Sequence, residues 1–111
     1  MKSQLKSKKW LKSPFDVVTQ NEVKKLMNNP TLLEDAFYKD LEFGTGGIRG
    51  VMGVGSNRVN KYTFGKVTQG LSDYLKQFFL NDDKISAVIG YDCRNNSKTL
   101  AKVVADVLSA N

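Results

Sequence analysis

Hydrophobic residues recur at spacings of three and four in two long stretches of the chain, which is the pattern of amphipathic helices. The first stretch covers residues 60–79, and the second follows Ser97, whose hydroxyl is placed to cap a helix. The second stretch carries one clean apolar stripe, formed by Leu100, Val103, Val104, Val107 and Leu108. Because such a stripe is stable only when another layer covers it, both stretches predict helices that pack on a larger core.

Two shorter helices are predicted before these by paired hydroxyl and carboxylate residues. Thr19 and Glu22 form one T-x-x-E capping box, and Thr31 and Glu34 form a second directly after Pro30. In a capping box the hydroxyl accepts a bond from the backbone of the first turn and the carboxylate returns one. The sequence therefore predicts helices that begin at these two threonines.

The stretch "ISAVIGYD", residues 85–92, is apolar almost without interruption at its start, which favours a strand covered on both faces, as in a parallel sheet. Short strands are also predicted over Leu41–Phe43 and near Ile48. This order of elements predicts an α/β fold. Crossover topology would place another strand after the last helix, and because none follows we expect a fragment cut within an α/β domain.

Composition excludes several classes of protein. Hydrophobic residues make up 41% and charged residues 25%, which is typical of a soluble globular domain. No apolar run approaches the roughly 20 residues of a membrane span, and the start lacks a signal-peptide core, so we expect a cytoplasmic protein without a membrane partner. With no histidine and Cys93 alone, the chain cannot form an internal disulfide, a structural zinc site or a Ser-His-Asp triad.

The net charge of +6 is concentrated in "MKSQLKSKKWLKSP", which holds five lysines and no acid. Such a segment can contact nucleic acid or an anionic surface. The alternative is a solvated, partly frayed segment anchored by Trp10, Leu11 and Phe15. We favour the second interpretation, and expect no nucleic-acid partner, because no aromatic interleaving or helix-turn-helix pattern supports the first.

The segment "EFGTGGIRGVMGVGSNRVN", residues 42–60, is rich in glycine, which is used where the backbone turns tightly or approaches a ligand. Successive backbone N–H groups there can form a concave anion site. The candidate phosphate-binding residues are Thr45, Gly46, Gly47 and Arg49, because a hydroxyl and a guanidinium fork complement such a site. The dinucleotide fingerprint and the P-loop motif both fail here, so a set of tight turns between strands remains the alternative.

A second polar cluster lies in "GYDCRNNS", where Asp92 and Arg94 follow the predicted buried strand. Ligands of open α/β sheets bind beyond the carboxyl ends of strands, which makes both residues candidates for a site. A purely structural pair that fixes the loop is the alternative.

Together, "FGTGGIRGVMGVGSNRVN", "YTFGKVTQGLSDYL" and "VIGYDCRNNS" resemble the first domain of the α-D-phosphohexomutases, the phosphoglucomutase/phosphomannomutase superfamily. The "WLKSPFDVVTQNEVKKL" stretch is similar to the branch of longer phosphoglucomutases and phosphopentomutases. The resemblance implies a three-layer α/β/α domain with a mixed sheet, incomplete here, over residues 19–111 after a basic extension of residues 1–18. The motif matches are Phe43, Gly44, Thr45, Gly47, Ile48, Arg49, Gly90, Asp92, Arg94 and Ser97.

The resemblance also implies an activity for the intact enzyme. Members move a phosphoryl group between the 1- and 6-positions of glucose or mannose phosphates through an enzyme phosphoserine, with Mg²⁺ and glucose 1,6-bisphosphate as activator and intermediate. The T-A-S-H-N-P phosphoserine loop does not occur in this sequence, so no catalytic residue or metal ligand is assigned. By residue, the resemblance makes Thr45 and Arg49 phosphate-facing and Asp92 with Arg94 loop organisers. We expect an inactive fragment that exposes apolar surface or self-associates; a phosphopentomutase and a free-standing basic binding module remain alternatives.

Overall fold

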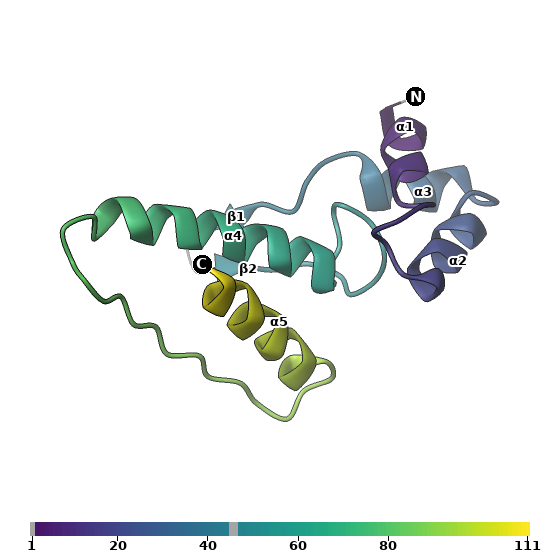
Figure 1. Cartoon of the computed structure of the whole chain (residues 1–111). Helices are drawn as coiled ribbons and strands as arrows, with labels where there is room; N and C mark the ends of the chain where they lie inside the picture. Colours follow the sequence, from purple (N-terminus) through teal and green to yellow (C-terminus); the bar gives the residue numbers. More distant parts are fainter. Residues whose placement is uncertain (1, 45–46) are drawn as a thin grey trace. The chain divides into compact units, whose positions relative to one another are not determined.

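The computed structural model describes residues 2–44 and 47–111, which divide into two compact units that meet between Asn60 and Lys61. Figure 1 shows the helices and the two short strands of the described residues. None of these helices combines the length and the apolar character needed to cross a membrane. In chain order the elements are α1 (Lys2–Lys9), α2 (Val17–Leu26), α3 (Pro30–Phe37), β1 (Phe43–Gly44), β2 (Gly47–Ile48), α4 (Lys61–Phe78) and α5 (Ser97–Ala110).

The first unit has a small core between its helices. Val23, Leu33, Ala36 and Phe37 are buried there. Trp10 packs against this core, with its ring stacked on Phe15 at 4.4 Å between centroids. The predicted anchoring by aromatic residues is therefore confirmed.

The basic start is more ordered than a frayed segment. It forms α1, which contacts α3 and buries Ser3 and Ser7 on one face. The small serine side chains allow this close contact, while lysines, Gln4 and Leu5 occupy the rest of the helix surface. The boundary at residue 18 between a basic extension and the domain stays a prediction.

Both short helices exist, but the predicted capping boxes are wrong. The Asp16 carboxylate accepts a hydrogen bond from the Thr19 N–H at 2.7 Å and caps α2. The Asn29 side chain caps α3 by accepting from the Leu32 N–H at 3.3 Å. Each helix begins earlier than predicted because Asp and Asn are strong N-caps and proline suits the first helical position.

The second unit contains the two long helices, both of them confirmed. α4 and α5 pack against each other, and Gly65 of α4 faces Val103 and Val107 of α5. The side-chain amides of Gln69 and Asn111 exchange hydrogen bonds of 3.0 and 2.9 Å at the end of α5. No residue of α5 is fully buried, so its apolar stripe is only partly covered by α4.

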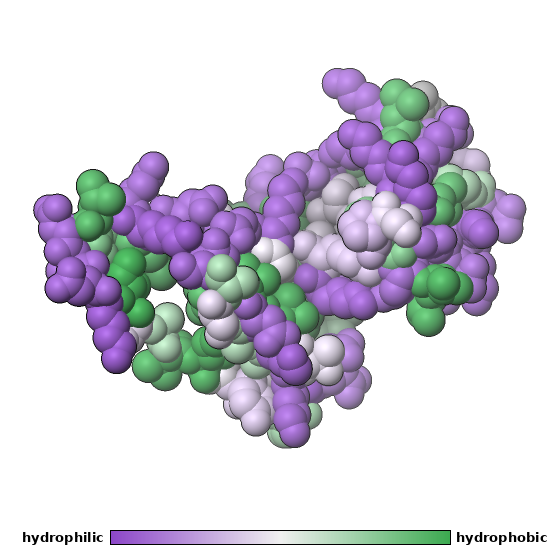
Figure 2. Space-filling view, in the orientation of Figure 1, coloured by the Kyte–Doolittle hydropathy of each residue, from purple (hydrophilic) through white to green (hydrophobic). Residues whose placement is uncertain are grey.

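The predicted strand over residues 85–89 is wrong. Residues 84–92 have no regular secondary structure and run as an irregular connection between the helices (Figure 1). Val88 is 99% exposed, and Figure 2 shows hydrophobic side chains open to solvent on this part of the unit. A strand needs a hydrogen-bonded neighbour, and within the described residues the paired strands are β1 and β2 of the other unit.

Candidate functional site

The glycine segment begins with a small hairpin. β1 and β2 are antiparallel, and Phe43 is opposite Ile48 while Gly44 is opposite Gly47. Gly47 has a φ of 121°, a conformation that glycine adopts far more readily than other residues. Arg49 is the first residue after the second strand of this hairpin. Two of the predicted phosphate-binding residues, Thr45 and Gly46, lie outside the described residues.

Arg49 immediately follows β2 and is exposed to solvent. Within the described part of the chain, its guanidinium makes no hydrogen bond or ion pair. The group keeps its positive charge at any working pH and offers paired donors in a fixed fork. Its position next to a glycine-rich hairpin therefore leaves it available to an anionic group.

Both legs of the hairpin are bonded to the same downstream segment. On one leg, the Leu41 N–H donates to the Ser56 carbonyl at 2.8 Å. On the other, the Val59 N–H donates to the Val51 carbonyl, also at 2.8 Å. Residues 56–59 thus hold the two ends of the hairpin at a fixed separation.

The side chain of Asn60 links the end of the glycine segment back to two of its glycines. Its side-chain amide donates to the carbonyls of Gly53 at 2.9 Å and Gly55 at 3.1 Å. Gly55 has a φ of 129°, and a Cβ atom there would overlap the carbonyl oxygen of Ala36 in α3. The glycine is therefore required for the loop to lie directly on the end of the helix.

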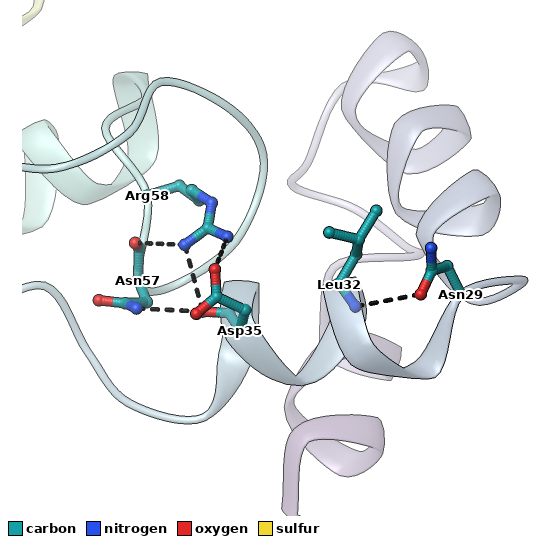
Figure 3. A network of polar contacts seen from close by, with 5 residues as sticks. All are labelled: Asn29, Leu32, Asp35, Asn57 and Arg58. Atoms are coloured by element: carbon teal, nitrogen blue, oxygen red, sulfur yellow. Dashed lines mark hydrogen bonds and ion pairs between the residues drawn. The ribbon is translucent and has the colours of Figure 1, made fainter.

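A polar network joins the same loop to α3 (Figure 3). We call it the α3 network; it consists of Asp35, Asn57 and Arg58. Arg58 donates to the Asp35 carboxylate through Nη2 and to the Asp35 carbonyl at 3.2 Å through Nη1. Asn57 Nδ2 donates to that carbonyl at 3.0 Å. The last carbonyls of a helix have no partner within it, and a cation near them is stabilised, so the network satisfies the end of α3.

The second predicted cluster forms a compact loop in the other unit. Arg94 donates to the Asp92 carboxylate through its backbone N–H at 3.0 Å and through Nε at 2.7 Å. These two bonds, the backbone one first, lower the pKa of Asp92. Both side chains remain largely exposed. The geometry is that of a structural pair fixing the loop, and a contribution of these residues to a phosphate site stays a prediction.

Ser97 does not cap α5 as predicted. Its hydroxyl accepts a bond from the Asp92 N–H at 3.1 Å, and it is the first residue of the helix. The N-cap is Asn96, which has a φ of 64°. The left-handed turn at Asn96 therefore directs the serine toward the Asp92 loop.

The candidate residues are distributed over both units. Gly47 and Arg49 belong to the first, and Asp92 and Arg94 belong to the second. Within the described residues, no group of three or more acidic, cysteine or histidine side chains could hold a metal ion. Anion binding by Gly47 and Arg49 stays a prediction.

Residues 40–111 match the family model of the phosphoglucomutase/phosphomannomutase α/β/α domain I. The chain belongs to this family. The match confirms the resemblance inferred from the glycine segment and the GYDCRNNS loop, and with it the α/β class. It covers the hairpin, Arg49, Asp92 and Arg94.

Curated relatives of the family agree with this assignment. A Staphylococcus epidermidis phosphoglucomutase is 37% identical over 99 residues, which is 87% of this chain and 18% of the relative. A Staphylococcus haemolyticus phosphoglucomutase is 39% identical over 80 residues, or 72% of this chain and 14% of the relative. A Schizosaccharomyces pombe protein named a probable phosphoribomutase is 35% identical over 100 residues, or 88% of this chain and 17% of the relative. The chain therefore spans less than a fifth of these relatives, and no solved structure matches it.

The α3 network was not predicted from the sequence. Its members Asn57 and Arg58 lie in the glycine segment, where polar residues among glycines were the only local signal. Their partner Asp35 lies 23 residues before Arg58, inside a helix that gives no sign of the pairing.

Proposed function

We propose that the chain is the N-terminal part of an enzyme that interconverts sugar 1-phosphates and sugar 6-phosphates, with glucose and mannose phosphates as substrates. The proposed route uses an enzyme phosphoserine and a bisphosphorylated sugar. The match of residues 40–111 to domain I of the family carries the proposal. Relatives named phosphoglucomutase, which align over most of this chain, support it further.

Arg49 is the residue that we propose to contact a phosphoryl group. Phosphoryl transfer depends mainly on positioning and on stabilising the charge of the transferred group. A donor that is fixed before the reaction stabilises that charge without reorganisation. An exposed guanidinium at the end of a glycine hairpin has the chemistry for this role, and Thr45, Gly46 and Gly47 would contribute through the backbone and the Thr45 hydroxyl.

Mg²⁺ and glucose 1,6-bisphosphate belong to the proposal for the intact enzyme. The described residues do not fit a magnesium site, because no three potential ligands gather there. We therefore assign no residue of this chain to the metal. We expect no turnover of glucose 1-phosphate by the chain alone, since its sequence lacks the T-A-S-H-N-P loop of the family.

Pentose phosphates are the second candidate substrates. The fission yeast relative named a probable phosphoribomutase aligns over 88% of this chain, as completely as the phosphoglucomutases do. We also propose a cytoplasmic location for either substrate class. The exposed free thiol of Cys93 suits a reducing compartment. A basic binding module is less favoured, since α1 has a buried face within the first unit.

Binding of sugar phosphate to the chain tests the proposal. We expect glucose 1-phosphate at millimolar concentration to shift the NMR signal of the Arg49 side-chain Nε–H, and ribose 5-phosphate and inorganic phosphate to serve as comparison ligands. Followed on the backbone amides of Ile48 and Gly50, the response should be lost in Arg49→Ala and retained in Lys25→Gln, a change at an exposed lysine of α2. In a full-length enzyme carrying this segment, Arg49→Ala should lower kcat/KM by about 100-fold, as for loss of a preorganised donor.

Kinetics and melting temperatures of Arg49 variants test the alternative that Arg49 has a structural role. Arg49→Lys should recover only part of kcat/KM, because an ammonium cannot replace the fork. The melting temperature should stay close to that of the wild type, since the side chain is exposed. A large fall in melting temperature with near-normal kcat/KM would show that Arg49 supports the loop and does not serve the phosphate.

A further inference from the structure

The hairpin that carries Arg49 has little support of its own. β1 and β2 contain two residues each, and a two-stranded ribbon of that size is not stable alone in water. Phe43 of β1 is 67% exposed, and the two residues of β2 are only partly buried, so packing gives the hairpin limited support. The orientation of Arg49 therefore depends strongly on what the two legs of the hairpin are attached to.

Both legs are attached to residues 56–59, as the Leu41–Ser56 and Val51–Val59 hydrogen bonds show. Val51 is only two residues beyond Arg49, so the second bond fixes the backbone close to the guanidinium. The position of residues 56–59 consequently determines the direction in which the hairpin presents Arg49.

Residues 56–59 are in turn held to α3 by Arg58. Its guanidinium contacts the Asp35 carboxylate, the Asp35 carbonyl and the Asn57 carbonyl, the last two at 3.2 and 3.1 Å. The Arg58 side chain is only 13% exposed, whereas Asp35 is 62% exposed. A buried fork with several acceptors fixes both position and angle, which a single exposed ion pair would not do.

We propose that Asp35 and Arg58 are positioning residues for the phosphate-contacting Arg49. Their effect passes from the end of α3 through Arg58 to the adjacent Val59, across the Val59–Val51 hydrogen bond, and so to Arg49. The inference rests on the proposed function for its consequence in phosphate binding, and on the described contacts alone for the attachment of the hairpin.

The test uses the full 111-residue chain and three variants: Arg58→Ala, Arg58→Lys and Asp35→Asn. Asp35→Asn keeps an oxygen acceptor and the backbone carbonyl, so it is the variant least disturbing to folding. The matched control is Lys25→Gln, which removes the exposed Lys25–Glu22 ion pair of α2 in the same unit. The fluorescence of Trp10, which packs on the core, reports whether each variant is folded.

Two measurements separate the attachment from its consequence. Amide hydrogen exchange at Leu41 and Val59 reports the hairpin attachments without any ligand. We expect exchange there to be at least about 10-fold faster in Arg58→Ala and intermediate in Arg58→Lys and Asp35→Asn, with Lys25→Gln unchanged. The affinity of the chain for glucose 1-phosphate should fall several-fold in Arg58→Ala and by less in Arg58→Lys and Asp35→Asn. It should stay unchanged in Lys25→Gln.

Folded variants with unchanged exchange at Leu41 and Val59 would overturn the proposal. Faster exchange with wild-type affinity would also overturn it, since Asp35 and Arg58 would then stabilise the loop without positioning Arg49. If the wild-type chain binds no sugar phosphate through Arg49, the proposed function fails, and the positioning role for phosphate fails with it. The exchange data then show separately whether the α3 network holds the hairpin.

Discussion

Arg49 and Arg58 show how environment gives one residue type two roles. The guanidinium of Arg49 is exposed and has no partner within the described residues, which leaves its donors for a ligand. That of Arg58 is mostly buried, and its donors are directed at oxygens of α3 and the loop. A buried arginine whose acceptors were removed would be left with unpaired donors, so its contacts are structural. Of these two arginines, Arg49 is therefore the one that we propose to contact a phosphoryl group.

The pKa of Asp92 provides a prediction at the same scale. Its carboxylate accepts from the backbone N–H and then the side chain of Arg94, and both bonds favour the charged form. A depressed folded-state pKa means that the stabilisation is present above the unfolded value and is lost as the pH falls through the folded value. An NMR pH titration should therefore find the pKa of Asp92 below that of an ordinary aspartate.

Arg94→Ala is the informative control for this titration. It removes the guanidinium but retains the backbone N–H, so the Asp92 pKa should rise only part of the way toward the ordinary value. Titration of wild-type Asp92 at or above the ordinary value would contradict the loop geometry described here.

Side chains bond backbone groups at both ends of α3. Asn29 caps its N-terminus, and Asn57 and Arg58 both donate to the Asp35 carbonyl near its C-terminus (Figure 3). The helix has only eight residues, too few to be stable by itself. Its stability therefore depends on these caps and on the buried face formed by Leu33, Ala36 and Phe37.

The N-cap of α3 is open to a direct test. Asn29→Ala should lower the free energy of unfolding by about 1 kcal/mol, because the Leu32 N–H loses its acceptor. Thr31→Ala is the matched control, since Thr31 is exposed and lies within the helix. It should change stability by less than about 0.5 kcal/mol. Urea denaturation measures both, and an equal loss in the two variants would support the T-x-x-E cap instead.

Helical elements were predictable from the sequence because their periodicity is local. The spacing in residues 60–79 and the stripe after Ser97 gave α4 and α5 nearly to their observed ends. The caps were missed because Asp16 and Asn29 compete with hydroxyl residues a few positions later. Val88 was misassigned for another reason: an apolar run reports a preference for burial, whereas a strand also needs a neighbour, which the described chain does not supply.

The candidate site was predictable to a similar extent. Gly47 and Arg49 could be chosen as candidates because the glycine segment is contiguous and its chemistry is visible in the sequence, and their role stays a prediction. The contribution of Asp35 could not be identified, since a pairing across 23 residues depends on how α3 and the loop pack. Asp92 and Arg94 were identified as a pair, and their bonds are present, because the two residues are near neighbours in the sequence.

At the scale of the whole molecule, the second unit exposes much of its apolar surface. Leu80, Ile85 and Val88, in the connection between α4 and α5, are exposed to solvent. Figure 2 shows hydrophobic side chains open to solvent on one face. The stripe of α5 is also incompletely covered, since none of its residues is buried. Folded monomers rarely leave contiguous apolar areas beyond a few hundred Å² open to water.

Self-association is the consequence that we expect for the chain studied alone. The irregular segment 84–92 combines exposed apolar side chains with backbone groups that are not paired in a sheet, and such segments readily pair with another copy. Sedimentation velocity should show a weight-average mass that rises with concentration, accompanied by binding of a dye specific for apolar surface.

Val88→Lys should reduce both the association and the dye binding, because Val88 is 99% exposed and carries no packing that the charge would disturb. Val18→Lys, at a residue 73% exposed on α2 of the other unit, adds the same charge elsewhere and should leave the association largely unchanged. A chain that stays monomeric at all concentrations and binds no dye would show that its exposed apolar residues are too dispersed to drive association. Equal effects of the two lysines would instead indicate that net charge, and not the apolar segment, governs the assembly.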